Sequence, residues 1–312
     1  MNNICIVIPY FGKWPRYLSF FLKSCSYNSK FIDYIIFTDN DFPLGGPSNV
    51  KFYEMSMNYF NELASQKLNI DISITDPYKL CDFKPSYGTI FSEYIYNYDY
   101  WGHGDLDLIL GNLSKFLKGV IAQDYHIISL RKEWVSGSFC LYRNTTEINN
   151  LFRCSKSVPS VFLNDHHYSF TECMHLWDQL IKGFDILKID YDESMTYLIQ
   201  KKSLEGKLKY YHNTVIKESI DRKDFVCFNN GRVLDSKNCE YAFYHYITEK
   251  NKFKFFFPIW ENVPDKFYID STGFYTESEW NNLLYRFIFR ISRRVSGFKK
   301  FISYYLNHYI VN

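Results

Sequence analysis

The sequence predicts an α/β protein with a mixed, mainly parallel sheet flanked by helices, followed by a basic amphipathic C-terminal helical extension. Continuous apolar runs at residues 4–8 and 34–38 enclose a segment with helical spacing, which is typical of a strand–helix–strand unit with a right-handed crossover. The 312 residues are 46% hydrophobic and 20% aromatic, which is enough for a large core. From residue 281 onward there is no acidic residue.

The remaining elements follow from the spacing of apolar residues and from turn signals. Leu18, Phe21 and Leu22 place a helix between the first two strands, and Asn229-Asn230-Gly231 marks a hairpin turn. We expect further helices at 57–68, 87–97, from 113 and at 170–183, and further strands at 50–53, 126–130, 137–142, 225–234 and 241–246.

Composition excludes several classes of protein. The net charge of +2, without a basic run interleaved with aromatic residues before the C-terminus, indicates no nucleic-acid partner. The eight cysteines contain no Cys-x-x-Cys pair, which excludes the common zinc and thioredoxin motifs and suits reduced thiols. No secretory signal and no run of about 18 apolar residues is present, so we expect a cytoplasmic protein.

The stretch Trp-Gly-His-Gly-Asp-Leu-Asp at residues 101–107 carries most of the functional information. Asp105 and Asp107 lie at i and i+2, so in an extended segment both carboxylates point to the same side. Their repulsion would be relieved by a divalent cation, and hard cations with open positions also bind phosphate oxygens. The sequence therefore predicts a site for Mn²⁺ or Mg²⁺, although two solvated loop acids would give the same pattern.

Three segments in this order resemble one family. They are Pro-Tyr-Phe-Gly at residues 9–12, Asp-Phe-Lys-Pro-Ser-Tyr-Gly at 82–88, and the Asp-x-Asp (DXD) stretch at 101–107. The chain resembles GT-A-fold, nucleotide-sugar-dependent glycosyltransferases, and more narrowly the bacterial enzymes that build capsule and O-antigen polysaccharides. The similarity covers roughly residues 4–255 and implies a GT-A-like, Rossmann-like fold.

The resemblance also implies a binding site for the donor. Asp105 and Asp107 would hold the metal and the donor diphosphate. The residues that would approach the nucleotide sugar are Pro9, Tyr10, Phe11, Gly12, Asp39, Lys84 and Lys250. Asp39 could instead cap a turn, and Lys84 could be a solvated loop charge.

Members of such families bring a late histidine back to the metal. His245, in Tyr-His-Tyr at residues 244–246, has the matching position, and Lys250 follows it. An imidazole is an acceptable third ligand for Mn²⁺ beside two carboxylates. A hydrogen-bonded histidine in an aromatic cluster remains the alternative.

The acceptor side is less defined. Ser136 and Gly137 precede a predicted strand, where similar enzymes place a loop facing the donor and acceptor sugars, although an ordinary turn would look alike. Asp178 is a candidate general base, which an inverting reaction would need to deprotonate the acceptor hydroxyl. A solvated helix face is the alternative for Asp178.

We expect residues 1–260 to form the glycosyltransferase domain and 261–312 a C-terminal extension. Leu283, Phe287, Ile291 and Val295 recur at near-helical spacing among arginines and lysines, which indicates an amphipathic helix able to contact anionic membrane. Packing on its own domain or a dimer contact would also explain the pattern.

The predicted function is transfer of a hexose or hexosamine from a nucleotide diphosphate sugar, with UDP favoured, to a hydroxyl group. The resemblance suggests an undecaprenyl-diphosphate-linked oligosaccharide acceptor at the inner face of the cytoplasmic membrane. Two alternatives remain. One is a nucleotidyl- or phosphotransferase with the same paired aspartates, although no Gly-rich phosphate loop follows the first strand. The other is a non-catalytic carbohydrate-binding protein.

Overall fold

The computed structural model describes residues 3–221 and 224–309, and residues 301–309 as backbone only. The chain forms two compact units, each built from separated segments. The first unit comprises Met1–Trp14, Asn28–Asp105 and Ser114–Val215, and the second comprises Pro15–Tyr27, Leu106–Leu113 and Ile216–Asn312. The chain thus passes from the first unit to the second between Asp105 and Leu106, inside the Asp-x-Asp segment.

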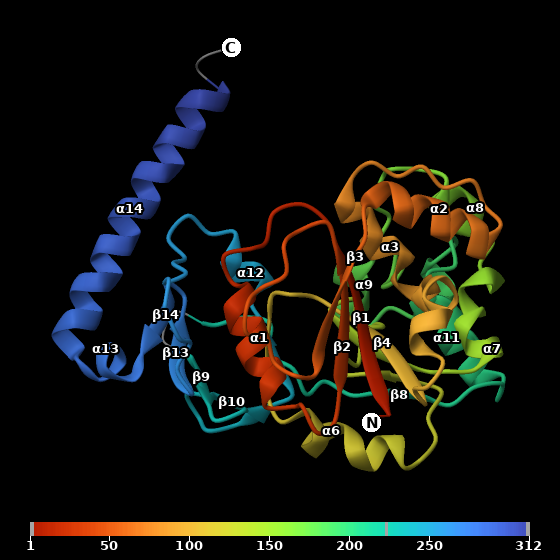
Figure 1. Cartoon of the computed structure of the whole chain (residues 1–312), viewed down its shortest axis with the longest axis horizontal. Coiled ribbons are helices and arrows are strands. Elements are labelled where there is room, and N and C mark those ends of the chain that lie inside the picture. Colours follow the sequence, from red (N-terminus) through yellow and green to blue (C-terminus); the bar gives the residue numbers. More distant parts are fainter. Residues whose placement is uncertain (1–2, 222–223, 310–312) are drawn as a thin grey trace. The chain divides into compact units, whose positions relative to one another are not determined.

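A seven-stranded sheet organises the first unit, with the order β3-β2-β1-β4-β7-β6-β8 (Figure 1). Neighbouring strands pair in parallel, except that β7 is antiparallel to both β4 and β6. This is the mixed, mainly parallel sheet that the sequence predicts. The strands are β1 (Ile4–Tyr10), β2 (Asp33–Thr38), β3 (Val50–Glu54), β4 (Tyr100–Gly104), β6 (Ile127–Ser129), β7 (Phe139–Arg143) and β8 (Tyr210–His212).

Helices flank this sheet, and a large hydrophobic core joins several of them to it. Val7 and Phe37 of the strands pack in one cluster with Phe60, Phe91 and Phe152 of the helical segments, all almost fully buried. The helices are α2 (Met57–Leu68), α3 (Leu80–Phe83), α4 (Tyr87–Ile90), α5 (Ser92–Ile95), α6 (Leu113–Ile121), α7 (Thr146–Asn149), α8 (Val158–Phe162), α9 (Trp177–Ile181), α10 (Ile186–Ile189) and α11 (Met195–Leu204), with 3₁₀ turns at Pro77–Lys79, Lys84–Ser86 and Leu151–Cys154.

The second unit contains a five-stranded antiparallel sheet, with the order β11-β10-β9-β13-β14, and a two-stranded sheet of β12 and β5. Its core is aromatic, and the ring of Phe20 stacks on that of Phe274 at 4.3 Å. The elements are α1 (Leu18–Ser26), β5 (Leu108–Leu110), β9 (Val226–Asn229), β10 (Arg232–Asp235), β11 (Glu240–Tyr241), β12 (Phe243–His245), α12 (Ile247–Lys250), β13 (Lys266–Asp270), β14 (Gly273–Thr276), α13 (Glu277–Asn281) and α14 (Leu283–Tyr309).

The five-stranded sheet of the second unit contains residues from both sides of the domain boundary expected after residue 260. Strand β13, on the far side of that boundary, pairs with β9, so residues 266–276 share a sheet with residues 226–235.

The predicted amphipathic extension is the continuous helix α14 (Figure 1). No helix among the described residues is long and apolar enough to cross a membrane.

Two helix predictions were wrong in detail. The helix expected at 87–97 is divided at Phe91, whose backbone leaves the helical region while its ring stacks on Phe37 at 4.4 Å. The helix expected at 170–183 is reduced to α9. The backbone N–H of Phe170 donates to the buried carboxylate of Asp82 at 2.8 Å, and Met174 and His175 have positive φ values of 49° and 63°. These contacts hold residues 170–176 in turns.

Candidate metal site

The sheet of the first unit reverses its strand order beside β1. The chain goes from β1 to β2 and β3 on one side, and β4 then pairs with the other side of β1, with Val7 opposite His103. In open α/β sheets, ligands bind beyond the carboxyl ends of the strands at such a switch point. The loop after Tyr10 and the carboxylate of Asp105 both follow strands that end there.

Asp105 is fixed by its own backbone and by a lysine. Its N–H donates to the carbonyl of Ser138 at 3.0 Å, and the Lys84 ammonium lies 2.5 Å from Asp105 Oδ1. Lys84 also donates to the carbonyl of Gly137 at 2.8 Å. Burial alone would lower the pKa of Lys84, but the Asp105 carboxylate outweighs burial and raises the pKa above its ordinary value. Lys84 is therefore a buried cation that positions Asp105.

Asp107 is buried beside a lysine and a histidine of the second unit. The Lys250 ammonium lies 2.7 Å from Asp107 Oδ2, and His245 Nε2 lies 3.3 Å from the same oxygen. Burial would raise the pKa of Asp107, but His245 and Lys250 together lower it well below its ordinary range. The carboxylate is thus held ionised, as a metal ligand must be.

Strand pairing in the second unit explains why a residue so far along the chain reaches Asp107. Strand β12 pairs with β5, and His245 is the register partner of Leu108. The other ring nitrogen of His245, Nδ1, lies 3.4 Å from Glu218 Oε1. A carboxylate behind a histidine fixes the orientation of the ring and raises its basicity toward a metal. Glu218 was not predicted, because no motif marks it.

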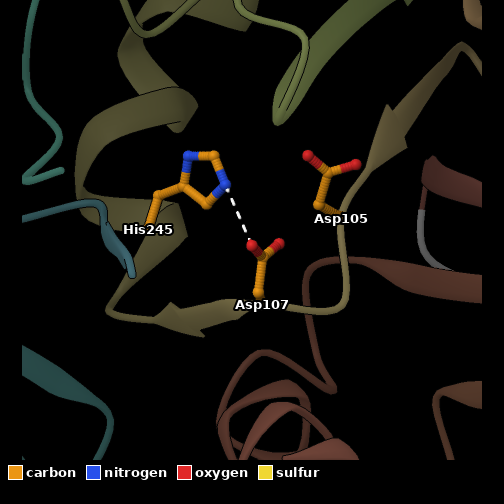
Figure 2. A group of neighbouring side chains, drawn as sticks. All are labelled: Asp105, Asp107 and His245. Carbon is orange, nitrogen blue, oxygen red and sulfur yellow. Dashed lines mark ion pairs between the residues drawn. The ribbon is translucent and has the colours of Figure 1, made fainter. Parts of the chain in front are cut away.

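Asp105, Asp107 and His245 each offer a ligand atom, and these three atoms lie within 4.8 Å of one another. Figure 2 shows the three side chains beside one another, with the His245 ring directed toward the Asp107 carboxylate. Two carboxylate oxygens and one imidazole nitrogen form a donor set that suits Mn²⁺, and Mg²⁺ accepts the carboxylates. The residues present therefore fit a divalent cation, as the sequence predicts. The identity of the cation remains a prediction.

The loop after β1 has a defined shape. Pro9 and Tyr10 end β1, Phe11 is buried, and Gly12 has a φ of 86°, which favours glycine. The Gly12 N–H donates to the Asp39 carboxylate at 2.9 Å. Asp39 thus caps this loop, as one of the two interpretations expects. Its proposed contact with the nucleotide stays a prediction.

Gly137 lies where the predicted sugar-facing loop meets Asp105. Strands β4 and β7 are antiparallel, with Gly104 opposite Phe139, so the residues before β7 lie beside the end of β4. The Gly137 N–H donates to Glu172 Oε1 at 2.9 Å, and Glu172 Oε2 accepts from the indole of Trp177 at 2.8 Å. The Ser136 hydroxyl is 3.0 Å from that of Ser138. Glu172 therefore supports the loop.

Asp178 lies in the five-residue helix α9 and is exposed. Within the described part of the chain, its carboxylate makes no hydrogen bond or ion pair. The neighbouring His175 has a positive φ, so the two residues do not share a regular helix face. The role of Asp178 as a general base stays a prediction.

Fold and site together define an α/β protein with a candidate divalent-cation site at the carboxyl edge of its parallel strands. The chain belongs to the family described as "Family of unknown function (DUF6625)", which it matches over residues 6–278. No curated protein sequence matches it.

The solved structures that are similar to this chain include three transferases. The galactosyltransferase LgtC, in complex with donor and acceptor sugar analogues, is 13% identical with a TM-score of 0.35, over 69% of this chain and 75% of LgtC. The glycosyltransferase GlyE of Streptococcus pneumoniae TIGR4 is 10% identical with a TM-score of 0.34, over 68% and 45%. A putative nucleotide-diphospho-sugar transferase of Desulfovibrio desulfuricans G20 is 12% identical with a TM-score of 0.29, over 65% and 96%.

Proposed function

We propose that this chain is a metal-dependent glycosyltransferase that moves a hexose or hexosamine from a nucleotide diphosphate sugar, with UDP favoured, to a hydroxyl group. The observation that carries the proposal is the convergence of Asp105, Asp107 and His245 within 4.8 Å, with Asp105 at the strand-order reversal beside β1. A diphosphate is the ligand chemistry that a divalent cation and nearby lysines attract together.

In this proposal, Asp105, Asp107 and His245 would hold Mn²⁺ or Mg²⁺. The bound cation would supply Lewis-acid stabilisation of the leaving diphosphate. Lys250, which already lies 2.7 Å from Asp107, would add positive charge for the same group. Lys84 would keep Asp105 in place, and the loop from Pro9 to Gly12, ordered by Asp39, would approach the nucleotide.

On the acceptor side, Ser136 and Gly137 would face the reacting sugars, with Glu172 holding Gly137 in place. If the reaction inverts the anomeric centre, Asp178 would take the proton of the acceptor hydroxyl. The proposed acceptor is an undecaprenyl-diphosphate-linked oligosaccharide of bacterial surface polysaccharide synthesis, of the capsule or O-antigen type. The proposed location is the cytoplasmic face of the membrane.

The test is to incubate the protein with UDP- and GDP-sugars and Mn²⁺, with and without chelator. We expect slow release of UDP or GDP by hydrolysis without acceptor, loss of that release with chelator, and recovery with added Mn²⁺ or Mg²⁺. A nucleotidyltransferase would instead release inorganic pyrophosphate or form a new nucleotide ester. Binding of nucleotide sugar without turnover, for every acceptor offered, would contradict the proposal and favour a carbohydrate-binding role.

A further inference from the structure

The side of helix α14 that packs against the rest of the second unit carries arginines. Arg290 forms an ion pair with Asp270 at 2.6 Å, and Arg286 donates to the carbonyl of Trp280 at 2.9 Å. Arg293 is 6% exposed, donates to the carbonyls of Thr272 and Phe274, and lies over three aromatic rings. These three arginines anchor the helix to the rest of the second unit, although the sequence alone would assign them to a membrane-facing charge cluster.

The opposite side of α14 is apolar and exposed. We call it the outer stripe, and it consists of Leu284, Phe287, Ile288, Ile291, Val295 and Phe298. These residues recur at helical spacing, and each is between 45% and 68% exposed. An amphipathic helix of a globular protein normally turns its apolar side inward, and a contiguous exposed apolar stripe of this kind marks an interaction surface.

A basic pocket of about 510 Å³ borders the same helix. It is lined by Lys252, Lys254 and Arg294, together with Ile220 and Ser271. Arg294 belongs to α14 and directly precedes Val295 of the outer stripe, and a Cβ on Gly297 would come within 2.8 Å of Lys254. The carboxylate of buried Glu249 lies 3.5 Å from Lys252 and orients that side chain.

We propose that the second unit docks on an anionic lipid bilayer, with the outer stripe in the interfacial layer and the basic pocket holding a lipid headgroup phosphate. Apolar side chains beside clustered Lys and Arg are what an anionic interface attracts. The exposed Lys299 and Lys300 add to this charge. The proposal concerns surface attachment and stands independently of the glycosyltransferase assignment.

Charge favours a bilayer over a second copy of this chain as the occupant. A two-fold contact through the outer stripe would bring the basic helix of one copy, which carries Arg294, Lys299 and Lys300, against the basic helix of the other. Segment 281–312 has no acidic residue to compensate that repulsion. An anionic surface is attracted by the same three side chains.

The test is sedimentation of the full chain with vesicles of phosphatidylcholine containing 30% phosphatidylglycerol, against pure phosphatidylcholine. We expect binding to the anionic vesicles only, weakening as salt rises. The variant Lys252→Gln/Lys254→Gln/Arg294→Gln should bind about a hundredfold more weakly, at about fivefold per lost charge. Its matched control, Lys182→Gln/Lys188→Gln/Lys201→Gln, removes three exposed charges from the first unit and should bind as wild type.

A second pair of variants tests the outer stripe. Phe287→Ser/Ile291→Ser should lose vesicle binding, whereas Leu44→Ser/Leu163→Ser, which changes exposed apolar residues of the first unit, should not. Circular dichroism and thermal unfolding check that each variant is folded. Equal loss of vesicle binding in the charge variant and its control would overturn the proposal. So would a wild-type protein that does not bind vesicles but forms a dimer that Phe287→Ser/Ile291→Ser dissociates. Truncation before α14 is a poorer test, because it leaves the buried Asp270 carboxylate without its ion-pair partner Arg290.

Discussion

The two carboxylates of the Asp-x-Asp segment are neutralised in opposite ways. In the first unit, the cation of the pair is the buried member, since the Lys84 side chain is 8% exposed and Asp105 is 28% exposed. In the second unit, the anion is the buried member, since Asp107 is 4% exposed and Lys250 is 23% exposed. Each pair thus has one partner that water can solvate and one that it cannot.

This difference determines which member of each pair can be replaced at the lower cost in stability. Removing the more exposed member leaves a buried charge without its partner, and that costs several kcal/mol. Removing the buried member leaves a charge that water reaches, and that costs less. The two pairs also explain how two carboxylates at i and i+2 can coexist before any metal cation binds. From the sequence alone, a bound metal was the only cation expected to relieve their repulsion.

The largest expected effect concerns activity. Asp107→Ala removes a charged ligand of the proposed metal, so we expect Mn²⁺ binding to be lost and kcat to fall by about 10³-fold or more. Titration calorimetry with Mn²⁺ and the release of nucleoside diphosphate measure the two effects. Asp71→Ala, at an exposed carboxylate elsewhere in the chain, is the control and should behave as wild type. Undiminished turnover in Asp107→Ala would contradict the site.

The next effect concerns stability in the first unit. Asp105→Asn leaves the Lys84 ammonium buried with only neutral acceptors, the new amide oxygen and the Gly137 carbonyl, so we expect a loss of about 3 kcal/mol in the free energy of unfolding. Lys84→Met leaves Asp105 partly solvated and should cost about 1 kcal/mol. Urea unfolding compares the two variants. The reverse order would show that burial of the remaining partner does not decide the cost.

The second unit should show the opposite dependence. Lys250→Met leaves the buried Asp107 carboxylate with the His245 ring beside it but without its lysine partner, and we expect a loss of about 2 kcal/mol. The same change of lysine to methionine should therefore cost more at position 250 than at position 84. Urea unfolding at neutral pH measures this difference, and equal costs would remove the contrast between the two pairs.

The first unit was largely predictable, because its motifs are residues in contact. The segments at 82–88 and 101–107 occur together since Lys84 holds Asp105, and since a Cβ on Gly88 would come within 2.5 Å of the Trp101 side chain. Continuous apolar runs specify β1 and β2 for the same local reason. The convergence of His245 on Asp105 and Asp107 followed from the resemblance, and β12–β5 pairing provides its physical basis.

The remaining features depend on contacts that leave no pattern in the sequence. The turns at residues 170–176 follow a segment that Asp82, nearly ninety residues earlier, fixes by accepting the backbone N–H groups of Tyr168 and Phe170. The direction of the α14 apolar side cannot be derived from its periodicity, since the same spacing allows either face to turn inward. Arg290 and Arg293 decide it, because Arg290 pairs with Asp270 of β13 and Arg293 donates to the carbonyl of Phe274 in β14.

The smallest expected effect tests the carboxylate behind His245. Glu218→Gln keeps the size of the side chain but removes its charge 3.4 Å from His245 Nδ1, so the ring becomes less basic and less firmly oriented toward the metal. We expect Mn²⁺ affinity to fall about tenfold, with little change in unfolding free energy, because Glu218 is 30% exposed. Glu261→Gln, at an exposed carboxylate of the same unit, is the matched control. Raising Mn²⁺ should restore turnover in Glu218→Gln but not in Asp107→Ala, and failure of that rescue would show that Glu218 acts on something other than metal binding.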